Sequence, residues 1–206
     1  MAEILATITE YYTKIHNIPV LYCAILAVAI PFIIIAVGYL IGLFGEALAT
    51  IVGMALAPQV AMAMVNYLFM PGVVIHEMAH AFMALITGAK VTEIALFKKQ
   101  DDSLGHVNFR NRGNALVVMI QNILVSSAPM YIGALVVYGA FYWMVTIPGG
   151  AWYLIVAKVL LGYLGVSMFF HMTMSGADIK IYMKGVPLLI PVLFIIAIPL
   201  RLTGVI

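Results

Sequence analysis

The sequence predicts an all-α polytopic membrane protein with about five to six transmembrane helices and a small β-hairpin at the membrane edge. Of its 206 residues, 65% are hydrophobic and only 9% are charged. Soluble domains carry roughly 45–50% apolar and about 25% charged residues. The apolar residues form long continuous runs, and in hydrocarbon such runs satisfy their backbone polar groups as helices. Lipid is therefore the expected solvent.

The charge pattern gives no indication of a nucleic-acid partner. The formal net charge is +2, and no basic tract or interleaving of basic and aromatic residues indicates nucleic-acid binding. Cys23 is the single cysteine, so no internal disulfide is expected. The first apolar run is too long for the hydrophobic region of a signal peptide. The oligomeric state is left open by the sequence.

Long apolar runs predict the transmembrane helices, each of which needs about 20 residues to cross a bilayer. In chain order the runs are Ile18–Phe44, a helix that starts at Met62 or Pro71 and ends near Thr87 and Gly88, Ala115–Val145 with Pro129 inside it, Ala151–Ser175, and Val186–Leu202. The stretch Ala47–Met70 is left open between spanning, re-entering and lying at the interface. Gly176–Gly185 is expected to be a short polar link before the last span.

One long polar segment, Ala89–Asn114, interrupts the apolar runs. Val91–Phe97 is rich in β-branched and apolar residues, and Gly105–Phe109 can form a second strand after a charged turn. A small hairpin at the membrane surface is therefore expected. We expect residues 1–206 to form a single domain with a core at about 62–184.

The Lys and Arg residues predict the orientation in the membrane. Five of them lie in Ala89–Asn114 and two in Gly176–Gly185, whereas the turn at Pro148 carries none. Short loops rich in Lys and Arg stay on the cytoplasmic side. Both basic segments are therefore expected to face the cytoplasm in a multi-pass protein of the cell membrane.

The motif H-E-x-x-H lies inside an expected helix, where it reads His76-Glu77-Met78-Ala79-His80. Residues four apart are neighbours on one helix face, and two imidazoles so placed can bind one Zn²⁺ at about 2.0–2.1 Å each. Glu77 is about 100° round the helix from His76, so it can act as general base without binding the metal. The competing interpretation is a buried Glu–His pair that serves packing, but charged groups in a span are costly and usually functional.

A catalytic zinc site needs a third protein ligand and an open fourth position. Glu93 and His106 in the expected hairpin are candidates, as are His171 and Asp178 near the end of the fourth span. Membrane depth favours the last two. His171, Ser175 and Asp178 are spaced i, i+4 and i+7, so they share a face if the helix persists. One of them can then bind the metal while another orients a ligand.

Together these features resemble the site-2 protease family of intramembrane zinc metalloproteases. The resemblance covers about Gly72–Lys184: H-E-x-x-H in a span, a small membrane-edge sheet, a span containing Ala128 and Pro129, and a further span ending in an Asp. It implies one Zn²⁺ per chain, with Asp178 as the third ligand beside His76 and His80. The family's N-P-x-x-D-G around that Asp is here Met174-Ser175-Gly176-Ala177-Asp178-Ile179.

The resemblance also implies a function, which is hydrolysis of peptide bonds in membrane-spanning or membrane-associated substrates, with Glu77 as general base and the site toward the cytoplasm. Two alternatives remain. A non-proteolytic metal-binding scaffold would not need Glu77, and a metal transporter is expected to carry several intramembrane acidic or His positions along a path. The expected partners are a membrane protein or peptide substrate and the lipid bilayer, and no nucleic acid.

Overall fold

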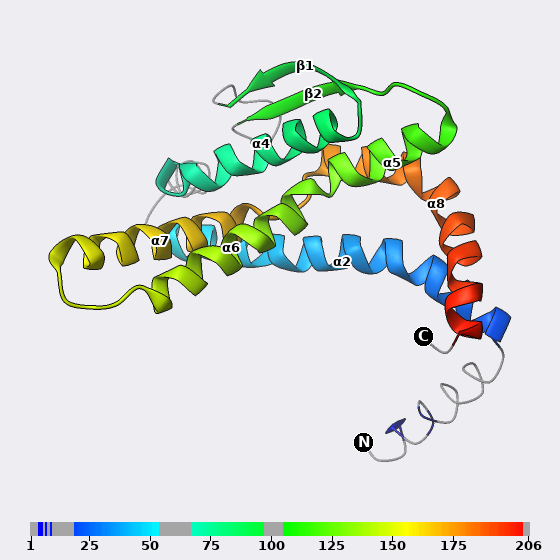
Figure 1. Cartoon of the computed structure of the whole chain (residues 1–206), viewed down its shortest axis with the longest axis horizontal. Helices are drawn as coiled ribbons and strands as arrows, with labels where there is room; N and C mark the ends of the chain where they lie inside the picture. Colours follow the sequence, from blue (N-terminus) through cyan, green and yellow to red (C-terminus); the bar gives the residue numbers. More distant parts are fainter. Residues whose placement is uncertain are drawn as a thin grey trace.

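The computed structural model describes residues 4, 5, 7, 9, 19–53, 67–96 and 105–203. Within them, helices and two strands follow in the order α2 (Pro19–Gly53), α4 (Met70–Ile86), β1 (Lys90–Ala95), β2 (His106–Arg110), α5 (Ala115–Ser126), α6 (Ala128–Thr146), α7 (Trp152–His171) and α8 (Gly176–Leu202). The described part of the chain is mostly helical, as predicted, and Figure 1 shows its arrangement.

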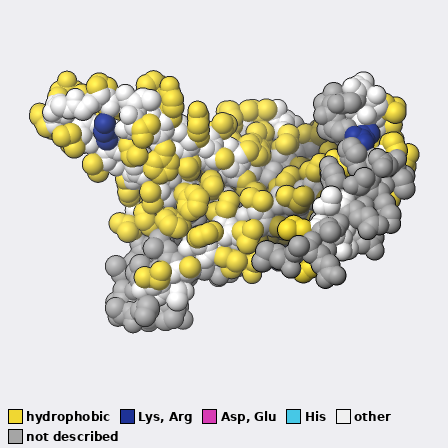
Figure 2. Space-filling model, turned by 90° about the horizontal axis from the view of Figure 1, so that it is seen from below, with side chains coloured by type: hydrophobic (Ala, Val, Ile, Leu, Met, Phe, Trp, Pro, Cys, Tyr) yellow, Lys and Arg dark blue, Asp and Glu magenta, His cyan; other side chains and the backbone are white. Residues whose placement is uncertain are grey.

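Four of the described helices are long and apolar enough to cross a membrane, namely Pro19–Gly45 of α2 and the helices α6, α7 and α8. The helices α4 and α5 are apolar but shorter, with 17 and 12 residues. Large apolar side chains on the long helices are exposed, for example Ile33 at 56% and Val159 at 66%. Figure 2 shows one face that is almost wholly hydrophobic, with Lys and Arg only toward its two ends. An apolar surface of this extent supports a membrane protein.

The third expected span is two helices rather than one. Ala115–Val145 was predicted as a single run, but α5 ends at Ser126 and α6 begins at Ala128. Ser127 lies between them with φ −93° and ψ 1°. Pro129 explains the break, because a proline has no N–H to donate to the carbonyl four residues earlier and its ring clashes with that carbonyl.

The predicted polar link Gly176–Gly185 is wrong, because these residues form the first turns of α8. The Ser175 side chain accepts a hydrogen bond from the Asp178 N–H, and the Asp178 side chain accepts one from the Ser175 N–H. This reciprocal pair is a capping box, which stabilises a helix start. The last expected span is therefore the C-terminal part of a single 27-residue helix.

The helix that carries the motif starts at the second of its two predicted positions. α4 begins at Met70 with Pro71 in its first turn. Gly88 follows its end with φ +78°, the left-handed conformation that glycine adopts past a helix C-terminus. Upstream, α2 extends beyond the predicted end at Phe44. The larger part of Ala47–Met70, residues 54–66, lies outside the described residues.

The centre of the fold is a broken hairpin, in which α5 and α6 form one arm and α7 and α8 form the other. Each arm is interrupted between its two helices. α5 packs on α8 and α6 packs on α7, and Figure 1 shows α5 and α6 running roughly end to end. A Cβ added to Gly133 of α6 would lie 2.5 Å from Met172, just past α7. The gap between α5 and α6 is therefore close to the gap between α7 and α8. α4 packs against α5, α6 and α7, so it lies across both breaks.

The predicted hairpin is present as an antiparallel two-stranded sheet. Lys90 pairs with Arg110 and Ala95 pairs with His106, and the register shifts between Val91 and Glu93. Both strands contact α4, and Figure 1 shows the sheet lying over that helix. The charged turn predicted between the strands lies outside the described residues.

Candidate metal centre

The two histidines of the motif lie one turn apart on α4 and converge through the same ring atom. His76 Nε2 and His80 Nε2 are 3.2 Å apart. The His80 side chain is 7% exposed and that of His76 is 14% exposed. Helical spacing of four residues explains why the rings meet, and the packing of α4 on the broken hairpin explains why both are buried.

Each histidine is held through its other nitrogen by a backbone carbonyl. His76 Nδ1 donates to the His171 carbonyl oxygen at 2.6 Å, and His80 Nδ1 donates to the Val125 carbonyl oxygen at 2.7 Å. A carbonyl oxygen can only accept, so Nδ1 must carry the proton in both rings. A neutral imidazole has one N–H, so both Nε2 atoms present lone pairs to each other. This tautomer is the one that binds a metal through Nε2.

Both carbonyls are available because of the helix breaks. In an unbroken helix the Val125 carbonyl would accept from the N–H four residues later, but that residue is Pro129, which has none. In an unbroken helix the His171 carbonyl would likewise accept from the Ser175 N–H. That N–H instead donates to Asp178 Oδ2 at 2.9 Å. The chain therefore frees one carbonyl at each break, and each carbonyl orients one histidine.

Asp178 brings a carboxylate to the same point from the start of α8. Its Oδ1 is 3.4 Å from His80 Nε2, and its Oδ2 is 4.0 Å from His76 Nε2. Oδ2 also accepts hydrogen bonds from the Ser175 N–H and from Ser175 Oγ, the latter at 2.6 Å. The capping box thus fixes the carboxylate through Oδ2 and leaves Oδ1 directed at His80.

The donor set fits a zinc ion. One ligand atom from each of His76, His80 and Asp178 lies within 4.8 Å of the others, the single such group among the described residues. Two ligands at about 2.0–2.1 Å from a tetrahedral zinc are roughly 3.3 Å apart. The two distances to His80 Nε2, 3.2 Å from His76 Nε2 and 3.4 Å from Asp178 Oδ1, are close to this value, whereas His76 Nε2 and Asp178 Oδ2 are 4.0 Å apart. Two imidazole nitrogens and one carboxylate are also a donor set that zinc takes in proteins.

Glu77 lies beside this group and beneath the hairpin. It is 5% exposed, and its carboxyl interacts electrostatically with His80 and Asp178. A Cβ added to Gly105, at the start of β2, would lie 2.8 Å from Glu77 Cγ and 3.2 Å from its Oε1. The absence of a side chain at Gly105 is therefore what allows β2 to cover this carboxyl closely.

The structure separates the four candidates for the third ligand. Asp178 joins the two motif histidines. The His171 ring points back along its own helix, with Nδ1 2.8 Å from the Ser167 carbonyl oxygen, and only its main chain contacts the group. Glu93 and His106 pair with each other on the sheet at 3.6 Å. The ligand role of Asp178 stays a prediction, since proximity alone does not establish metal binding.

One further contact holds the start of α4 against α7, and the sequence did not predict it. Ser167 Oγ donates to the Phe69 carbonyl oxygen at 2.7 Å and accepts from the Gly72 N–H at 2.7 Å. A Cβ on Gly72 would lie 2.2 Å from the Ser167 carbonyl oxygen. Gly72 therefore allows the close approach that places His76 one turn later against the end of α7. The sequence signal was a glycine four residues before the motif, but its partner Ser167 is 95 residues away.

Comparison of the chain with protein-family models, with curated proteins and with solved structures finds no match.

Proposed function

We propose that this chain is a multi-pass cell-membrane zinc metalloprotease that hydrolyses peptide bonds of membrane-spanning or membrane-associated substrates. The observation that carries the proposal is the convergence of two Nε2 atoms and a carboxylate oxygen within 4.8 Å of one another, with the buried carboxyl of Glu77 on the same helix. Three protein ligands with one open position are typical of catalytic zinc, whereas structural zinc usually has four.

Four residues of the chain would take part in amide hydrolysis. His76, His80 and Asp178 would hold the metal. Bound zinc supplies Lewis acidity and makes a water molecule a stronger nucleophile near neutral pH. Glu77 takes the proton that the water loses as its oxygen forms a bond to the carbonyl carbon. Glu77 then returns the proton to the leaving nitrogen as the C–N bond breaks, which yields a carboxylic acid and an amine.

The burial of the site restricts the form of the substrate. A transmembrane helix uses its carbonyls in its own hydrogen bonds, so a helical segment cannot offer one to the site. The substrate segment must therefore be extended where it is cut. The two-stranded β1–β2 sheet lies over α4, and an extended substrate segment would add to an edge of it as a strand.

The test is cleavage of a model transmembrane substrate by purified protein, with zinc measured in the same samples. Glu77→Gln should keep its zinc and lose roughly 10²–10⁴-fold in rate, because only the base is removed. Lys158→Gln is the control for loss of a charged side chain, since Lys158 lies on α7 nine residues before Ser167, and it should cleave at the normal rate.

Cleavage by Glu77→Gln at the wild-type rate would contradict the mechanism. A wild-type protein that holds zinc but cleaves no substrate would instead support the non-proteolytic scaffold.

A further inference from the structure

Three cationic side chains gather where the β1–β2 sheet joins the helices α4 and α5 (Figure 1). Lys90 is the first residue of β1 and Arg110 is the last residue of β2, and the two are Cα partners across the sheet. Arg112 follows two residues later, and Gln121 fixes its main chain through two hydrogen bonds of 3.0 Å, one to its N–H and one to its carbonyl oxygen. All three cations are exposed, and we call them the basic patch.

Lys90 and Arg110 point away from α4. Their strand neighbours Val91 and Phe109 pack against the buried cluster that joins α4 to α5. Successive side chains on a strand point to opposite faces, so the two cations lie on the outer face of the sheet. Side chains that are directly opposite in an antiparallel pair lie close together, and like charges there are destabilising. The sheet therefore keeps an unfavourable pair of charges at this position.

No described ion pair includes a member of the basic patch. Glu93 is the acidic residue of the described sheet, and it pairs with His106 at 3.6 Å and accepts a hydrogen bond from Asn108 Nδ2 at 3.2 Å. Glu77 and Asp178 are buried at the metal centre. The exposed cations can therefore bind an anion that comes from outside the described chain.

Exposed apolar side chains border the basic patch on the side of the helices. Leu85 and Ile86, in the last turn of α4, are 66% and 62% exposed, and Leu116, in the first turn of α5, is 50% exposed. Hydrocarbon is the favourable surrounding for side chains exposed to this extent. Basic residues just beyond the apolar part of a membrane protein lie at the level of the lipid headgroups. The neighbours of the patch therefore favour a lipid over a soluble anion.

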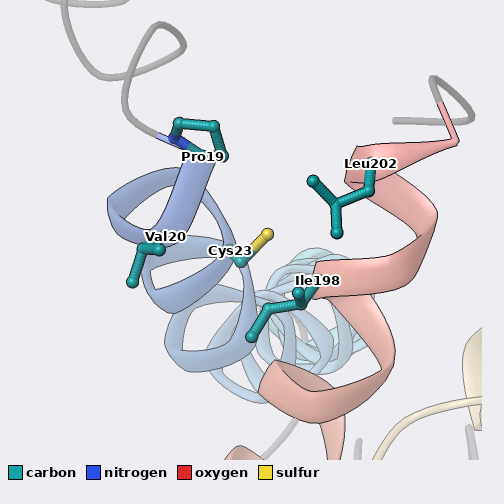
Figure 3. Close-up of a pocket in the computed structure, with 5 residues that line it drawn as sticks. All are labelled: Pro19, Val20, Cys23, Ile198 and Leu202. Atoms are coloured by element: carbon teal, nitrogen blue, oxygen red, sulfur yellow. The ribbon is translucent and has the colours of Figure 1, made fainter.

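A crevice between α2 and α8 differs from the patch because its lining carries no charge. It has a volume of about 230 Å³ and is lined by Pro19, Val20, Cys23, Ile198 and Leu202 (Figure 3). These side chains have nothing with which to hold a phosphate group.

We propose that the basic patch binds the phosphate of an anionic phospholipid in the surrounding bilayer. Guanidinium groups bind phosphate through paired, charge-assisted hydrogen bonds, and an ammonium group adds a compact charge. A phosphate between Lys90 and Arg110 would replace their repulsion by two attractions. The lipid would hold this end of the sheet at the membrane surface, and its binding does not depend on a metal at the site on α4.

Native mass spectrometry of the delipidated protein tests the proposal with two lipids of identical acyl chains, phosphatidylglycerol and phosphatidylcholine. Wild-type protein should retain phosphatidylglycerol more tightly, and each cation removed from the patch should lower this preference by about fivefold. Arg110→Gln removes one such charge. Lys158→Gln is its matched control, because Lys158 lies within α7 and outside the patch, and it should keep the full preference.

Three results of this experiment would overturn the proposal. The first is equal retention of the two lipids by wild-type protein. The second is an equal loss of preference in Arg110→Gln and Lys158→Gln, which would show a general effect of charge. The third is a preference that survives replacement of all three patch residues by glutamine, because the lipid would then be bound elsewhere.

Arg110→Glu separates lipid binding from a structural role of this residue. It replaces the like-charge pair with an opposite-charge pair, so the melting temperature in detergent without phospholipid should be kept or raised. The preference for phosphatidylglycerol should nevertheless be lost, because the new carboxylate pairs with Lys90 and repels phosphate. A lower melting temperature would show that Arg110 serves the sheet itself, and an unchanged preference would show that it does not contact the lipid. Either result would overturn the proposal.

Discussion

Pro129→Ala should weaken zinc binding although Pro129 contacts no ligand atom of the group. Alanine restores the N–H that proline lacks, and that N–H can donate to the Val125 carbonyl if α5 continues into α6. The Val125 carbonyl would then accept a second hydrogen bond besides the one from His80 Nδ1, which is 2.7 Å long in the structure. It would therefore hold the His80 ring less firmly. The Nε2 lone pair of His80 would lose its fixed direction toward the metal.

The size of the effect follows from what such partners contribute. Removal of a hydrogen-bond partner of a metal-binding histidine typically costs about 10–100-fold in affinity, which is roughly 1.4–2.7 kcal/mol. The His80 contact is short and buried, so no water can replace the carbonyl. We therefore expect zinc affinity to fall within that range while the helices still form, because a continuous helix is itself favourable.

Zinc affinity can be measured by competition with a chromogenic chelator. Pro31→Ala is the matched control, because Pro31 is also fully buried within a helix but lies on α2, which supplies no member of the metal group. It should bind zinc normally. An unchanged affinity in folded Pro129→Ala would refute the argument that this proline frees the carbonyl for His80.

Three other predictions concern the site and its placement. Gly105→Ala should keep zinc but lower cleavage, since its Cβ would lie 2.8 Å from Glu77 Cγ and must displace the base; normal cleavage would show that β2 does not cover Glu77 during the reaction. Asp178→Ala should lose most bound zinc and His171→Ala should keep it, because the group uses only the main chain of His171; zinc analysis showing the reverse would identify a three-histidine site. A cysteine at Lys184, in a Cys23→Ser background, should react with a membrane-impermeant thiol reagent only from the cytoplasmic side, and labelling from outside intact cells would contradict the orientation.

Much of the fold followed from local signals in the sequence. Continuous apolar runs predicted helices, and β-branched residues around a charged turn predicted the sheet, since both patterns depend on neighbouring residues only. One error came where composition and capping disagreed. The polar residues after Gly176 suggested a link, but Ser175 and Asp178 form a capping box, and that signal indicates a helix start.

The sequence predicted which side chains lie together in the candidate site, but not which groups hold them in place. Helical spacing brings His76 to His80, and the resemblance pointed to Asp178, which the structure places beside them. Which carbonyls hold the histidines depends on how α4 packs across two breaks far away in the sequence. Pro129 was visible as a proline inside a span, but nothing local to it indicates that His80 would take the freed carbonyl.

The most direct test of the central claim is the zinc content of the purified protein, measured per chain by elemental analysis. The geometry of His76, His80 and Asp178 predicts one zinc in the wild-type protein and close to none when both histidines are replaced by alanine. A wild-type protein that holds no more zinc than the double variant, after expression in zinc-replete medium, would contradict the claim.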